Sequence, residues 1–147
     1  MDDFETLREM KAQGFHCSQI LLKFGLELQG KENPDLVRAM HGLAGGVGFT
    51  GELCGALTGG ACLLGLYAGK GLPEEEEDEH LNLMVEDLVN WFKQQYGQSF
   101  GGIRCAEIVG ENGQYKAARC PQIVAETYQQ VKELLIENGF SLEGPEA

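Results

Sequence analysis

The chain has 147 residues and a formal net charge of −12, from 23 acidic and 11 basic residues. This excess of acids repels phosphate backbones and anionic lipids, so it argues against nucleic acid and membrane surfaces as partners. Hydrophobic residues make up 43% of the chain, which is ordinary for a globular protein. The length suffices for one hydrophobic core, and we expect a single domain over residues 1–147.

Apolar residues recur at intervals of three and four from the start of the chain, which is the period of an amphipathic helix. A first helix contains Phe4 and ends at Gly14, and a second runs from about His16 to Gly30. A third begins at Pro34, because proline is favoured in the first helical position. The pattern predicts a helical N-terminal third.

The middle of the chain is rich in glycine and poor in charge. Ten of the 21 glycines fall between residues 45 and 71, and residues 53–69 carry no charged side chain. Thr50 is a plausible N-cap, so we expect a buried central helix over 51–68. Gly55 and Gly59 are four apart and share one face, where another backbone can approach closely. The stretch is short and diluted by glycine, which argues against insertion in a membrane.

Helical periodicity continues through the second half. The acidic run 74–79 is expected to be a solvated helix start, from which a long amphipathic helix reaches Tyr96. A short helix is expected over 103–109, and the last one opens at Cys120 and ends at Gly139. No segment alternates as a β-strand does. The sequence therefore predicts an all-α, single-domain compact helical bundle with the glycine-rich helix at its centre.

The N-terminal residues are acidic and include no apolar segment of the kind found in signal peptides. We therefore expect a cytoplasmic protein, in a compartment where thiols are normally kept reduced.

Four of the five cysteines occupy one kind of position, at or within the first turn of an expected helix. The amides and dipole of a helix N-terminus stabilise a thiolate and lower its pKa. Arg104 and Arg119 directly precede two of these cysteines and add positive charge. We therefore expect these helix ends to converge on one anionic sulfur site, formed by Cys17, Cys54, Cys105 and Cys120.

Cys62 is excluded from that site by its distance along the central helix. It follows Cys54 by eight residues, about 12 Å at ~1.5 Å per residue, whereas a disulfide requires Cα atoms within about 7 Å. We expect Cys62 to act as a small hydrophobic residue in the core.

Two observations limit the reading of this pattern. Free cysteines are often buried without a function, and the chain has no CxxC pair, which argues against zinc ribbons and thioredoxin motifs. Among the histidines, His80 lies amid acids and is expected at the surface, and His16 is expected to point away from its neighbour Cys17. His41, just before the glycine-rich stretch, stays open as a ligand.

The spaced cysteines resemble those of the redox-active protein family named for its C–GCAxxG–C–C pattern. The matching segments are HCSQ at 16–19, CGALTGG at 54–60, IRC at 103–105 and RCP at 119–121, so the likeness covers nearly the whole chain. The family's label places glycine before the second cysteine, whereas here Gly55 follows Cys54. The resemblance implies that the four recurrent cysteines are Cys17, Cys54, Cys105 and Cys120. A similar domain occurs in split-Soret cytochromes, where an iron–sulfur cluster is implicated.

Three functions are consistent with these observations. The first is electron transfer by an iron–sulfur cluster of unspecified type, with the four cysteines as ligands. The second is metal-free thiol–disulfide redox chemistry or sulfur carriage by the same thiols. The third is a structural zinc site that stabilises the fold. We expect a redox or electron-transfer protein with a protein partner rather than a stand-alone catalyst, and a homodimer stays open.

Overall fold

The computed structural model describes residues 2–144, and within them the chain is all-α. The helices are α1 Asp3–Ala12, α2 Cys17–Leu28, α3 Pro34–Met40, α4 Gly55–Ala68, α5 Glu79–Phe92, α6 Gln98–Phe100, α7 Cys105–Val109 and α8 Lys116–Glu137. Short helical turns, η1 His41–Leu43, η2 Lys93–Gly97 and η3 Glu111–Gly113, lie between them. The predicted fold class is confirmed.

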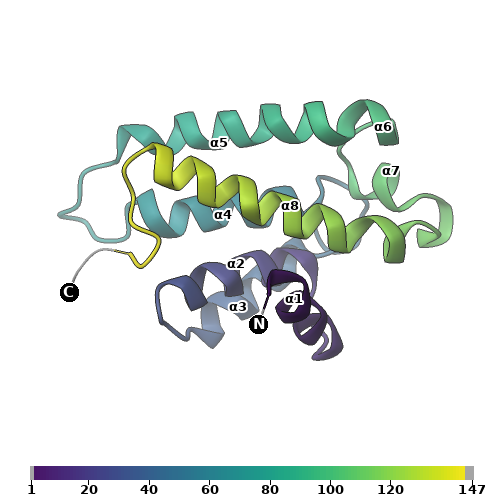
Figure 1. The fold of residues 1–147 in the computed structure, drawn as a ribbon, viewed down its shortest axis with the longest axis horizontal. Coiled ribbons are helices and arrows are strands. Elements are labelled where there is room, and N and C mark those ends of the chain that lie inside the picture. The colour runs from purple at the N-terminus through teal and green to yellow at the C-terminus, as the bar shows by residue number, and fades with distance from the viewer. Residues whose placement is uncertain (1, 145–147) are drawn as a thin grey trace.

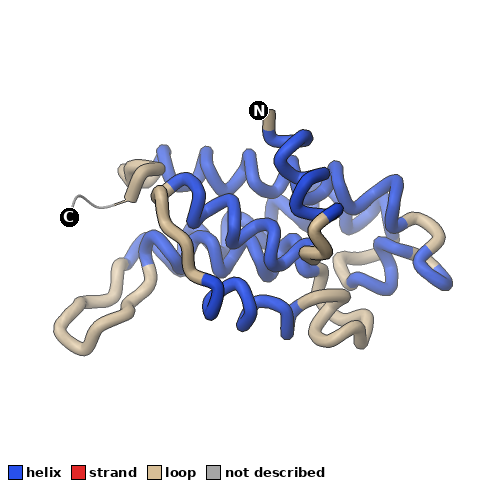
Figure 2. The backbone as a smooth tube through the Cα atoms, turned by 90° about the horizontal axis from the view of Figure 1, so that it is seen from below, coloured by secondary structure: helices blue, strands red, loops and turns tan. Residues whose placement is uncertain are grey.

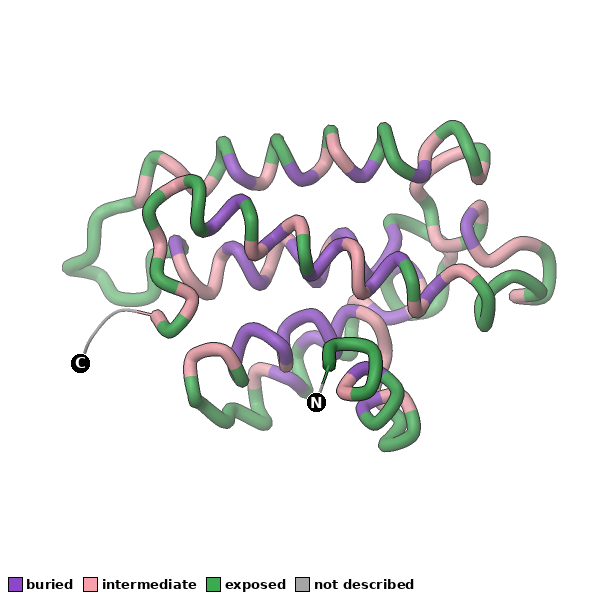
Figure 3. Tube along the Cα trace, in the orientation of Figure 1, coloured by how far each residue is buried: buried purple, intermediate pink, exposed green. Residues whose placement is uncertain are grey.

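Helix α4 lies at the centre of the bundle, as the sequence predicts. It packs against α2 on one side and against α5 and α8 on the other (Figure 1). Figure 3 shows buried positions along each of these helices, with exposed positions on the outer side of α5. The core contains leucines of α4, aliphatic residues of the surrounding helices and aromatic residues such as Phe24, whose ring stacks on Tyr128 with centroids 4.2 Å apart.

The contact between α2 and α4 depends on two glycines of α4. A Cβ atom on Gly59 would lie 3.0 Å from the Cα and carbonyl oxygen of Ser18, and one on Gly55 would lie 3.4 Å from the Ser18 amide. The backbones are therefore close enough that a side chain at Gly59 would press on the neighbouring helix. The expected close approach over this glycine face is confirmed.

Three helix starts differ from the expectation. Helix α5 begins at Glu79 with Asp78 as its N-cap, so most of the acidic run 74–79 precedes the helix instead of starting it. Helix α4 begins at Gly55 with Cys54 as its N-cap, and Thr50 caps nothing because its hydroxyl donates to the carbonyls of Gly46 and Val47 in the preceding loop. Helix α8 begins at Lys116, one turn before Cys120, so Pro121 lies inside the helix rather than at its first position. Pro121 has no amide hydrogen, so α8 lacks the helical hydrogen bond to the carbonyl of Ala117, and the proline ring crowds that carbonyl.

The loop after α3 and the loops on either side of α7 lie at the same end of the bundle (Figure 2). The opposite end holds the connection between α4 and α5, which includes most of the acidic run. None of the helices described is both long enough and apolar enough to cross a bilayer.

Candidate functional site

The loop-rich end of the bundle contains a cavity of about 470 Å³ that opens to solvent. All four cysteines singled out from the sequence line it, and each comes from a different segment: Cys17 from α2, Cys54 from the start of α4, Cys105 from α7 and Cys120 from α8. Cys54 and Cys120 are buried, whereas Cys17 and Cys105 are half-buried. The fold thus brings together thiols that are up to 103 residues apart in the sequence, from 17 to 120.

Backbone pairing aligns the two segments that carry Cys54 and Cys105. Leu53 and Arg104 form an isolated antiparallel bridge. The amide of Cys54 donates to the carbonyl of Ile103 at 3.1 Å, and the amide of Cys105 donates to the carbonyl of Glu52 at 2.6 Å. This pairing fixes both cysteines at neighbouring helix starts, with their side chains at the same cavity.

The glycine-rich loop before Cys54 makes this approach possible. A Cβ atom on Gly46, where φ is +74°, would lie 2.4 Å from the Glu52 carbonyl oxygen and 2.8 Å from the Cys105 Cβ. Only glycine fits there. Val47 and Phe49 also have positive φ angles, 63° and 61°, which non-glycine residues adopt only at a cost of about 1–3 kcal/mol each. The loop is therefore a strained wall of the cavity.

Cys17 and Cys120 line the cavity together. A hydrogen bond between the two thiols lowers the pKa of Cys17 and raises that of Cys120. Cys17 is also the first residue of α2, and Lys11 and Lys116 favour its thiolate. Cys17 is therefore the thiol of the cavity that loses its proton first.

The other thiols are held in the neutral form in the metal-free chain. Burial raises the pKa of Cys54 to about 12, and it outweighs the amides of Ala56 and Leu57, which favour the thiolate. Burial also raises the pKa of Cys105. The expectation that each helix start lowers the pKa of its cysteine is therefore wrong for these two residues, because desolvation disfavours the charged form more strongly than the helix ends favour it. It is also wrong for Cys120, whose pKa is raised first by the hydrogen bond to Cys17 and then by burial.

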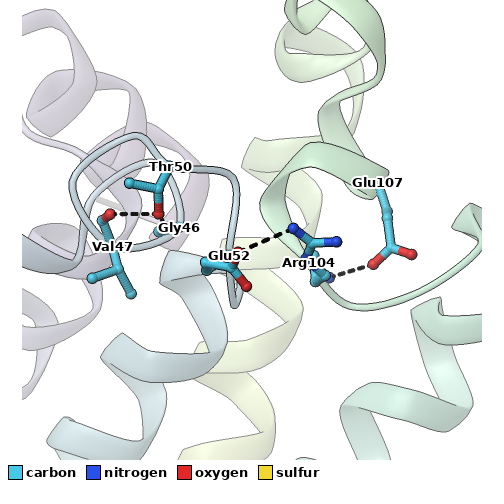
Figure 4. Close-up of polar contacts among 6 residues, drawn as sticks. All are labelled: Gly46, Val47, Thr50, Glu52, Arg104 and Glu107. Carbon is cyan, nitrogen blue, oxygen red and sulfur yellow. Dashed lines mark hydrogen bonds and ion pairs between the residues drawn. The ribbon is translucent and has the colours of Figure 1, made fainter.

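The two arginines beside the cysteines do not line the cavity. Arg104 forms an exposed ion pair with Glu52, with Nη2 and Oε1 3.1 Å apart, and its backbone amide donates to Glu107 (Figure 4). The guanidinium of Arg119 stacks on Tyr115 and Phe100 and donates to the carbonyl of Ile108. Adjacent residues in a helix point in different directions, so an arginine next to a cysteine need not share its site.

The positive charge at the cavity comes instead from Lys11 and Lys116, which both line it. The sequence analysis missed Lys11 because α1 contains no cysteine. It missed Lys116 because this residue lies before the start that was expected for α8. Lys116 and Cys120 are four residues apart, so a helix predicted to start at Lys116 would have placed both on one face. That spacing is the signal that could have identified Lys116. Phe15 and Phe49 add an apolar part to the same wall.

The remaining candidates divide differently from the expectation. His16 lines the cavity despite preceding Cys17, because it caps α2 in an extended conformation. His41 is not among the lining residues and lies behind His16, with ring centroids 5.0 Å apart. His80 pairs with Asp78, away from the cavity. Cys62 is also outside the cavity, as expected, but it is half-buried on α4 rather than a core residue.

Neither a curated protein nor a solved structure matches this chain. A family model does, and its match takes in all four cysteines and most of the helices that carry them. The chain belongs to the family described as "Putative redox-active protein (C_GCAxxG_C_C)", whose model matches residues 15–134.

Proposed function

We propose that this redox-active protein carries electrons on an iron–sulfur cluster bound by Cys17, Cys54, Cys105 and Cys120. The observation that carries the proposal is that all four thiols line one cavity. Four cysteine thiolates are the usual ligand set of [2Fe–2S] and [4Fe–4S] clusters. Electrons would pass to and from a partner protein, since the cavity opens to solvent.

The donors do not form a compact single-ion site in the described part of the chain. Within residues 2–144, no three side chains of His, Cys, Asp and Glu lie close enough together to hold one metal ion. Four sulfurs on one zinc ion lie about 3.8 Å apart, given Zn–S distances of about 2.3 Å. The four thiols share one cavity of about 470 Å³, and a cluster would use all four as ligands.

The chain's own residues suit an anionic group of this kind. A bound cluster supplies a site that gains and loses one electron at a time. Lys11 and Lys116 offset the negative charge of the thiolates, and Phe15 and Phe49 limit the access of water to the sulfurs. Metal binding displaces the thiol protons, so the raised pKa values of the buried cysteines make assembly more favourable at higher pH.

One contact favours a second function. The hydrogen bond between Cys17 and Cys120 places two thiols in the order that thiol–disulfide exchange needs, with one thiolate and one neighbour able to pair with it. In this metal-free alternative Cys17 attacks a disulfide of the substrate and expels one substrate thiolate. Cys120 then displaces the second substrate thiol and leaves the Cys17–Cys120 disulfide, so the two electrons come from the two cysteines.

The metal content of protein purified without oxygen decides between these functions. The cluster predicts a brown protein that contains iron and acid-labile sulfide, and serine at any one of the four cysteines should bleach it or make its colour labile. Cys62→Ser is the matched control and should keep the colour, because Cys62 lies outside the cavity. Colourless, iron-free protein in which Cys17 and Cys120 pair reversibly would establish the alternative, and one firmly held zinc ion would establish a structural site.

A further inference from the structure

We propose that the cavity also binds a small organic anion, attracted by Lys11 and Lys116 and packed against Phe15 and Phe49. The inference concerns the charge and apolar surface of the wall, and it does not rest on the cluster. The cavity has a volume of about 470 Å³, which falls in the range of small-molecule sites.

The first argument is the sign of the charge. The chain has 23 acidic and 11 basic residues, yet the charged residues that line the cavity are the two lysines, without a carboxylate. Neither lysine forms an ion pair within the part of the chain that the structure describes. A cleft lined by one sign of charge concentrates ligands of the opposite sign. In a chain this acidic, two unpaired lysines at one opening select for an anion.

The second argument is the position of the lysines and the apolar residues at the rim. Lys116 is exposed, and its Nζ lies 6.0 Å from the centre of the Phe49 ring. Phe49 is 58% exposed although its ring also contacts His16 edge to face at 5.3 Å. An exposed phenylalanine held at a positive φ angle beside a lysine offers a flat apolar surface next to a charge. This combination fits an organic acid better than an inorganic ion.

The lysines act on only part of the sulfur site. Both lysines act on Cys17, Cys120 and His16, and Lys116 also acts on Cys105, whereas neither acts on Cys54. An anion between the lysines would therefore lie on the side of Cys17 and Cys120. There it would lie beside Cys17, which lines the same cavity.

Charge-selective alkylation tests this inference. Iodoacetate and iodoacetamide have similar size, but only iodoacetate is an organic anion. The full chain is used with its thiols free, either as purified or after chelation of its iron, and mass spectrometry follows each cysteine. We expect the ratio of iodoacetate to iodoacetamide rates to be about tenfold higher at Cys17 than at Cys62, the lower end of the range for charged clefts. The ratio should fall at high salt.

Substitution of the lysines supplies the controls. Lys11→Gln and Lys116→Gln should lower the iodoacetate rate at Cys17 several-fold and change the iodoacetamide rate much less, whereas Lys70→Gln, away from the cavity, should change neither. Calorimetry on the same protein with its thiols free gives a second measurement, in which benzoate should bind and neutral benzamide should not. Equal rate ratios at Cys17 and Cys62, or benzoate binding that Lys116→Gln leaves intact, would overturn the inference. Iron and sulfide content is unaffected by either result, so the cluster is judged separately.

Discussion

The packing of α2 on α4 gives a quantitative test of the fold, through replacement of Gly59 by alanine. The added Cβ would lie 3.0 Å from the Cα and the carbonyl oxygen of Ser18 and 3.0 Å from the Cβ of Leu21. Two of these atoms belong to the backbone of α2, so the contact is relieved only if the whole helix moves. Because Cys17 is the first residue of α2, that movement would also displace it from the cavity.

Two opposing effects set the magnitude. Alanine favours the helical conformation over glycine by about 1 kcal/mol, which alone would stabilise the protein. Overpacking a tight contact costs about 1–3 kcal/mol. We therefore expect Gly59→Ala to lower the free energy of unfolding by up to about 2 kcal/mol, and Gly59→Leu to lower it further.

Gly65 is the matched control on the same helix, since a Cβ there would have no neighbour within 4 Å. Gly65→Ala should raise the free energy of unfolding by about 1 kcal/mol, because only the helix propensity changes. Urea unfolding followed by circular dichroism measures the free energy of unfolding of both variants against the wild type. In thermal unfolding, a change of about 1 kcal/mol should shift Tm by about 2–4 °C. If Gly59→Ala stabilises the protein as much as Gly65→Ala does, the close contact between α2 and α4 is refuted.

Three further outcomes follow from the charges at the cavity. If a cluster is present, Lys116→Gln should lower its reduction potential in a redox titration, because Lys116 lines the cavity. Arg119→Gln should leave the potential unchanged, since Arg119 stacks on aromatic rings outside the cavity. An equal shift in both variants would contradict the assignment of the cavity's positive charge to the lysines. Burial raises the pKa of Cys54 in the folded chain to about 12, above the value of 9.0 for an unperturbed thiol, so metal-free protein should lose up to about 1.4 kcal/mol of stability per pH unit between these two values. The stability that Cys54 contributes is fully present below pH 9. In urea unfolding, the free energy of unfolding of Cys54→Ala should decline less steeply with rising pH than that of the wild type. An equal slope in both proteins would show that Cys54 does not cause the decline. Cys120→Ala should raise the pKa of Cys17, so that iodoacetamide alkylation of Cys17 moves to higher pH, and an unchanged profile would show that the hydrogen bond has no such role.

The local chemistry of this chain could be read from its sequence. Helical periodicity and glycine positions indicated the all-α fold and the close face of α4, because both depend on residues three or four apart. The four cysteines were identified as one set from their places near helix starts, and the structure lines one cavity with them. Cys62 was excluded by the length of the helix alone.

The tertiary structure decided which charges and which helix ends face that cavity. Arg104 and Arg119 were natural candidates because they adjoin cysteines, but adjacent side chains diverge, and both arginines turn to other partners. Lys11 and Lys116 replace them because α1 and α8 meet at this end of the bundle, which no local pattern reveals. The thiol pKa values were also beyond the sequence: a helix start favours a thiolate locally, whereas desolvation depends on every segment packed around the sulfur.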